Sequence, residues 1–245
     1  MDTSYWLQTN PKVTVDHTTK KYFGKYLYKL VVYAPAGRLI DSKPNVTMES
    51  ALEHRRSVAK HINQSGWWGA RMNKDIENAD IDFLNKLRNI RHARLPGIKL
   101  RVEEPRVQIY GDSEDRLKDL VQTQFNKFQQ SYIESVAGPE DNVAESVLNS
   151  GAIIRKNDIG YRYKVVLRDG RYTSDIKNSM LQYLTNLGPE QIQLPKSAVE
   201  MLQKHTSYIW NLYFYCNDPE ITSFLSLIQP GIVSNCHELV VMPHK

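Results

Sequence analysis

Apolar and polar residues alternate with a period of two in several segments of the chain, and this pattern predicts β-strands. The clearest such segments are residues 25–35, 98–104, 106–112 and 160–170. Further strands are expected at residues 151–157, 208–218 and 237–242. Apolar residues with helical spacing predict helices at residues 48–64, 75–93, 113–135, 173–187, 197–205 and 218–229.

The order of these elements repeats. Each half of the chain reads strand–helix–strand–strand–helix–strand, which is the order of a ferredoxin-like unit, with both helices on one face of an antiparallel sheet. We therefore expect an α+β fold of two tandem ferredoxin-like (βαββαβ) units. The first unit would span residues 1–155, with an N-terminal extension and an extra helix at residues 75–93, and the second would span residues 156–245.

Short stretches of the two halves are also similar in sequence. Residues 26–31 (YLYKLV) parallel residues 161–166 (YRYKVV), and residues 109–112 (IYGD) parallel residues 214–217 (FYCN). These matches favour an internal repeat. Chance similarity is the alternative, because Tyr and Val are common in strands.

In such a unit the helices leave one sheet face uncovered, so every second strand residue points outward. Residues expected to point inward include Tyr161, Tyr163, Val165, Leu167, Trp210, Leu212 and Phe214. The outward set of the first half is then Lys29, Lys99, Arg101, Glu103, Arg106, Gln108 and Tyr110. The outward set of the second half is Arg162, Lys164, Val166, Arg168, Asn211, Tyr213 and Tyr215.

Cations beside tyrosines on an uncovered sheet suit single-stranded nucleic acid, because cations neutralise phosphates and aromatic rings stack on bases. The sequence pI of about 9.0 favours a polyanionic partner. RNA-recognition motifs use a four-stranded sheet in this way. Their consensus is absent from both halves, so no family is inferred. A solvated polar face, or a face that packs on a partner chain, is the alternative.

Positive charge is concentrated between Lys86 and Arg106, where seven Lys or Arg residues stand against two Glu residues. Arg88, Arg91 and Arg94 are spaced by three, which brings them to one side of a helix. We expect them to flank the nucleic-acid surface, although a solvated helix face is the alternative.

Trp67, Trp68 and Arg71, in a stretch bracketed by glycines, form a second candidate contact. The alternative is that one Trp fills the core and the other shields a loop.

Sequence motifs for catalysis are missing. The chain contains no GxxxxGK[ST], GxGxxG, GxSxG or HExxH motif, and its two cysteines lack zinc-site spacing, so neither a cofactor nor a metal is expected. His54 and His92 stand among arginines and are the candidates for general acid–base catalysis in a metal-independent ribonuclease. We regard an enzyme as the less favoured hypothesis.

The leading hypothesis is a cytoplasmic, non-enzymatic protein that binds single-stranded RNA or DNA. The competing hypothesis is a viral or phage structural or assembly protein that uses the same surfaces for protein contacts, including a homo-oligomer. A membrane partner is not expected, because the N-terminus does not resemble a signal peptide and no apolar run approaches about 20 residues. The low cysteine content is consistent with a reducing compartment.

Overall fold

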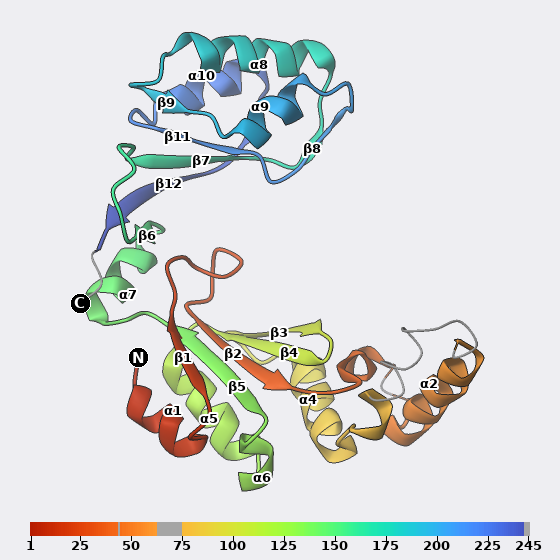
Figure 1. Ribbon diagram of the computed structural model, residues 1–245. Helices are drawn as coiled ribbons and strands as arrows, with labels where there is room; N and C mark the ends of the chain where they lie inside the picture. The colour runs from red at the N-terminus through yellow and green to blue at the C-terminus, as the bar shows by residue number, and fades with distance from the viewer. Residues whose placement is uncertain (44, 63–74, 243–245) are drawn as a thin grey trace. The chain divides into compact units, whose positions relative to one another are not determined.

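The computed structural model describes residues 1–43, 45–62 and 75–242. The chain has a mixed α+β fold with two five-stranded sheets, and it divides into two compact units, Met1–Glu145 and Ser146–Lys245 (Figure 1). Within the described residues, no helix is both long and apolar enough to cross a membrane.

The first unit is built on a sheet with the strand order β1-β5-β2-β4-β3. Its strands are β1 (Thr14–His17), β2 (Tyr28–Tyr33), β3 (Ile98–Glu103), β4 (Arg106–Gly111) and β5 (Ile133–Gly138). Its helices are α1 (Thr3–Thr9), α2 (Met48–Ile62), α4 (Ile81–Ala93), α5 (Glu114–Gln124) and α6 (Lys127–Gln130), with a 3-10 turn η1 (Gly37–Asp41). The pairs β5–β2, β2–β4 and β4–β3 are antiparallel, and β1 joins the edge parallel to β5.

The second unit has a sheet with the order β6-β12-β7-β11-β9 and a separate two-stranded ladder of β8 and β10. Its strands are β6 (Ile153–Arg155), β7 (Tyr163–Leu167), β8 (Gly170–Arg171), β9 (Ile192–Gln193), β10 (Tyr208–Ile209), β11 (Tyr213–Cys216) and β12 (Val233–Val241). Its helices are α8 (Ser174–Asn186), α9 (Lys196–Gln203) and α10 (Ile221–Ile228), and α7 (Asn142–Asn149) spans the boundary between the units.

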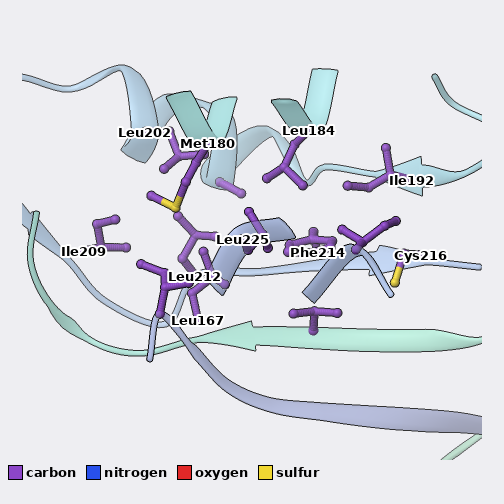
Figure 2. Packing of buried hydrophobic residues seen from close by; sticks show 14 of the residues in the cluster. Leu167, Met180, Leu184, Ile192, Leu202, Ile209, Leu212, Phe214, Cys216 and Leu225 are labelled. Atoms are coloured by element: carbon purple, nitrogen blue, oxygen red, sulfur yellow. The ribbon is translucent and has the colours of Figure 1, made fainter. Parts of the chain in front are cut away.

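In the second unit α8, α9 and α10 all lie on one side of the sheet (Figure 1). Between them and the strands lies an apolar core, to which β7 contributes Leu167, β11 contributes Phe214, and α8 contributes Met180 and Leu184 (Figure 2). The alternation of β7 and β11 follows from this packing, since Val165 and Leu167, and likewise Phe214 and Cys216, are buried. No helix in the described part of this unit covers the other face.

The two sheets share their strand register. Lys29 pairs with Tyr110 across β2 and β4, and Lys164 pairs with Tyr215 across β7 and β11. Both last strands, β5 and β12, have an irregular register at the corresponding place, next to Val31 in the first sheet and Val166 in the second. Each sheet also gains an edge strand parallel to its last strand, β1 or β6.

Three sequence expectations differ from the structure. The helix expected over residues 113–135 ends at Gln124, because Phe125 is extended and Asn126 begins the separate helix α6 with a capping box. Residues 133–138 form β5, the last strand of the first sheet, whereas the segment 151–157 supplies β6 to the second sheet. The strand expected over residues 208–218 is interrupted at Asn211, whose φ of 49° is left-handed.

Candidate nucleic-acid interface

The helix-free side of the second sheet brings tyrosines and cations together. The rings of Tyr213 and Tyr215 lie 5.6 Å apart in an edge-on arrangement. The Lys164 Nζ is 3.9 Å from the centroid of the Tyr213 ring, and the Arg155 guanidinium carbon is 5.8 Å from that of the Tyr215 ring. We call Arg155, Lys164, Tyr213 and Tyr215 the tyrosine face.

Strand register assembles this face. Lys164 and Tyr215 are direct cross-strand partners, so their side chains leave the sheet on the same side. Both tyrosines are half-buried, and burial raises the pKa of the Tyr213 hydroxyl. His237 is the partner of Lys164 on β12, and its Nδ1 lies 2.9 Å from the carbonyl oxygen of Gly151.

The arginines of this unit lack carboxylate partners. Arg155, Arg162, Arg168 and Arg171 form no ion pair with any residue that the structure describes. Arg162 and Arg168 are exposed just before and just after β7 and so flank the tyrosine face. Unpaired cations retain their charge for an anionic ligand.

Three of the eight acidic residues of the second unit lie in its helices or directly before one. Asp175 is in the first turn of α8, Glu200 lies in α9, and Glu220 precedes α10. By contrast, the stretch from Arg155 to Arg171 holds six Lys or Arg residues against two Asp. The segment from Arg155 to Arg171, which contains β7, therefore has a local positive excess, which favours an anion near the tyrosine face.

The equivalent position of the first unit is covered by its own chain. Tyr110 is only 3% exposed, and the rings of Tyr22 and Phe23 lie 5.3 and 5.0 Å from its ring. The Lys99 Nζ in turn lies 3.5 Å from the centroid of the Phe23 ring. Burial raises the pKa of the Tyr110 hydroxyl. The ring of Tyr26 lies 6.3 Å from that of Tyr110 as well. We call Tyr22, Phe23 and Tyr26 the aromatic cap, and it leaves Tyr110 no ring face for a base in this structure.

The arginines of α4 make tertiary contacts. Arg88 donates to the carbonyl oxygen of Val46 at 2.6 Å, and Arg91 pairs with Asp41 at 2.5 Å. Arg94 is exposed at the C-terminal cap, with a left-handed φ of 47°. Two of the three therefore tie α4 to the preceding segment, which is a structural use of their charge.

The cations of β3 and β4 also have acidic neighbours. Arg101 pairs with Glu103 at 2.9 Å, and Arg106 pairs with Glu134 of β5. Glu103 and Glu134, together with Arg106, line an open hollow of about 650 Å³ on the first sheet. Part of the positive surplus read from the sequence is thus neutralised by carboxylates outside the Lys86–Arg106 segment.

The remaining candidates add no contact to a site among the described residues. Trp67, Trp68 and Arg71 lie outside the described residues. His54 in α2 and His92 in the last turn of α4 are both exposed. Among the described residues, no group of three His, Cys, Asp or Glu side chains is placed to hold a metal ion.

Sequence reasoning missed Arg155, because the pattern assigns its strand to the first unit. It also placed Trp210 inside, whereas Trp210 is 48% exposed, because the left-handed residue Asn211 resets the alternation. The face as a whole offers rings for stacking and cations for phosphates. No model of a protein family, no curated protein and no solved structure matches this chain.

Proposed function

We propose that this protein binds single-stranded RNA or DNA on the tyrosine face without cleaving it. One observation carries the proposal: Tyr213 and Tyr215 lie on the helix-free side of a sheet, beside Lys164 and Arg155. Stacking of one base on an aromatic side chain contributes about 1–3 kcal/mol, and each neutralised phosphate adds a salt-dependent term.

We further propose that both units are ferredoxin-like. Leaving aside the parallel edge strands, the orders β5-β2-β4-β3 and β12-β7-β11-β9 support this, because the first and third strands of each unit are central neighbours. RNA-recognition motifs present stacking aromatics on the two central strands of such a sheet. Here Tyr213 and Tyr215 are on the central strand β11 and Lys164 is on its neighbour β7.

A reducing, cytoplasmic site of action is part of the proposal, since Cys216 and Cys236 are both free thiols.

The test is the affinity of a labelled oligonucleotide, measured by fluorescence anisotropy over a series of salt concentrations. Tyr213→Ala/Tyr215→Ala is expected to lower the affinity about 100-fold, equivalent to about 1.4 kcal/mol for each ring. Labelled RNA should remain intact throughout. Full affinity in the double variant, or an affinity that does not depend on salt, would contradict the proposal.

A matched pair of charge variants sharpens the test. Arg155→Gln/Lys164→Gln should reduce the slope of log K against log salt by about 0.7 for each phosphate that is no longer neutralised. The control, Arg101→Gln/Arg106→Gln, removes the same number of charges from arginines that already have carboxylate partners. Equal reductions in the two variants would mean that only overall charge matters.

A protein-assembly function is the second candidate, and helix α10 provides a specific observation in its favour. Phe224 and Leu227 are 55% and 81% exposed there, and their spacing of three brings them to one side of the helix as a contiguous apolar pair. Light scattering after size-exclusion chromatography tests this candidate. An oligomer that becomes monomeric in Leu227→Ser would support it, and a monomeric parent protein would count against self-assembly.

A further inference from the structure

A second pair of aromatic side chains projects from the second unit on the ladder of β8 and β10. Tyr208 and Trp210 are 46% and 48% exposed, and their rings stack with centroids 6.3 Å apart and an interplanar angle of 30°. Ile209, between them, is 1% exposed and belongs to the apolar core (Figure 2). The two rings therefore point away from the core.

The backbone around this pair is well anchored. The Asn211 N–H donates to the Asp169 carboxylate at 2.7 Å, and the Trp210 N–H lies 3.4 Å from the Met201 sulfur. The left-handed φ of Asn211 shifts the in–out alternation by one residue. Ile209 is therefore followed in the core by Leu212 and Phe214, and not by Asn211 and Tyr213. Tyr208, Trp210, Tyr213 and Tyr215 therefore lie within eight residues of one segment, and none of the four rings belongs to the apolar core.

Cations flank the added pair as well. Arg171 is the direct cross-strand partner of Tyr208, so both side chains leave the ladder on the same side. Arg171 is exposed and, like Arg168, has no ion pair with a described residue. Asp169, the acidic residue beside Arg168 in the chain, accepts the Asn211 N–H with its carboxylate and keeps its negative charge.

We propose that Tyr208, Trp210 and Arg171 form a second stacking site, which extends the path of a single-stranded nucleic acid from the tyrosine face along the β8–β10 ladder. This inference rests on the proposed function. A strand rises about 3.3 Å per residue, so the segment from Tyr208 to Tyr215 spans at most about 23 Å, and less because Asn211 interrupts the strand. A stacked single strand advances about 3.4 Å per nucleotide, so a trinucleotide, at about 10 Å, is expected to occupy one of the two ring pairs.

Charge favours a polyanion over a protein at this site. An apolar protein contact would bury the Arg171 guanidinium without a carboxylate, which is costly. A phosphate backbone supplies the missing partner, and stacking on aromatic rings tolerates any base because every base has a π face. The same site can then bind RNA and DNA. Comparing the affinities for oligouridylate and oligothymidylate shows which of the two nucleic acids binds more tightly.

The experiment compares a trinucleotide with an oligonucleotide of about twelve residues, a length within the site sizes of single-strand-binding folds. Tyr208→Ala/Trp210→Ala should weaken binding of the longer oligonucleotide about 30-fold or more and leave trinucleotide binding within about twofold. The matched control is Tyr183→Ala/Phe224→Ala, which removes another stacked pair, at 5.5 Å and 29°, on the helical side of the same unit. This control should bind both oligonucleotides like the parent protein.

Tryptophan fluorescence gives an independent readout. The longer oligonucleotide should quench part of the emission of the parent protein, and Trp210→Phe should abolish that part. Normal binding of the longer oligonucleotide by Tyr208→Ala/Trp210→Ala would overturn the extended path, provided that Tyr213→Ala/Tyr215→Ala still binds weakly. If neither double variant has a reduced affinity, the proposed function itself fails. Self-association that depends on Tyr208 and Trp210, with oligonucleotide binding unchanged, would assign the pair to a protein contact instead.

Discussion

Glu104 joins the turn between β3 and β4 to two arginines from distant parts of the first unit. Its carboxylate oxygens accept hydrogen bonds from both terminal nitrogens of Arg55 at 2.8 Å, and one of them also accepts the Arg38 N–H at 2.9 Å. The Glu104 and Arg55 side chains are 14% and 15% exposed. The Arg55 Nε is buried without a hydrogen-bond partner among the described residues, so this guanidinium depends on Glu104.

Glu104→Gln is therefore expected to destabilise the protein substantially. The amide has one acceptor oxygen and turns donor hydrogens toward the Arg55 guanidinium, which is itself a donor. Removing one partner of a buried ion pair costs about 3–5 kcal/mol. Because both side chains keep some contact with water, we expect the lower end, about 3 kcal/mol, in urea unfolding at neutral pH.

The control and the pH dependence make this prediction specific. Glu53→Gln makes the same change in an exposed pair with Arg56 in α2, and it should cost at most about 0.5 kcal/mol.

Burial raises the pKa of Glu104, but the hydrogen bonds and charges of Arg55 and Arg38 outweigh it, so the pKa lies below the ordinary value of 4.5. A carboxyl group with a lowered folded-state pKa stabilises the fold above its unfolded-state pKa, and this contribution is lost as pH falls through the lowered value. The difference between parent and Glu104→Gln should thus be complete at neutral pH and shrink below about pH 4.5. A cost no larger than that of Glu53→Gln, or one that persists unchanged in acid, would refute the reasoning.

Three further predictions concern the second unit. Lys177 is 2% exposed and donates to the carbonyl oxygens of Lys204 and Thr206. Lys177→Ala should therefore lower the free energy of unfolding in urea by about 3 kcal/mol, whereas Lys196→Ala, at an exposed position, should lower it by less than about 0.5 kcal/mol. Equal losses would show that the hydrogen bonds of Lys177 do not stabilise the fold. Burial raises the pKa of Cys216 to about 12, so maleimide should label one thiol, Cys236, in the folded protein and two thiols after unfolding. Rapid labelling of both thiols in the folded protein would show that Cys216 is accessible. Asn211→Ala should cost about 1 kcal/mol in thermal unfolding and Asn211→Gly almost nothing, because a Cβ disfavours the left-handed region; indistinguishable variants would contradict this.

The outward residues of β7 and β11 could be predicted from the sequence, because both strands alternate without interruption. Lys164, Tyr213 and Tyr215 accordingly lie on one side of the sheet, as the pattern indicates. The alternation gave a wrong position for Trp210, since a single left-handed residue is not visible in a hydrophobic pattern. Strand β5 was missed because its register shift weakens the period of two and because a helical pattern precedes it.

Ion pairs were the other feature that the sequence did not reveal. A charge count along the chain assigns Arg91 and Arg106 to a basic surface, but their partners, Asp41 and Glu134, lie far away in sequence. The same holds for Tyr110, which is covered by rings from a segment more than eighty residues earlier. Such neighbours are set by the tertiary fold, and local patterns carry no information about them.

Strand β3 lies at the edge of the first sheet, with β4 as its one neighbour among the strands that the structure describes. An edge strand presents unpaired backbone N–H and C=O groups, which can recruit a strand from another molecule and start aggregation. Lys99, Arg101 and Glu103 are exposed along this edge, and charged side chains in such positions oppose the approach of a second sheet. Part of the basic run from Lys86 to Arg106 therefore opposes aggregation through this edge, and this effect does not depend on any ligand.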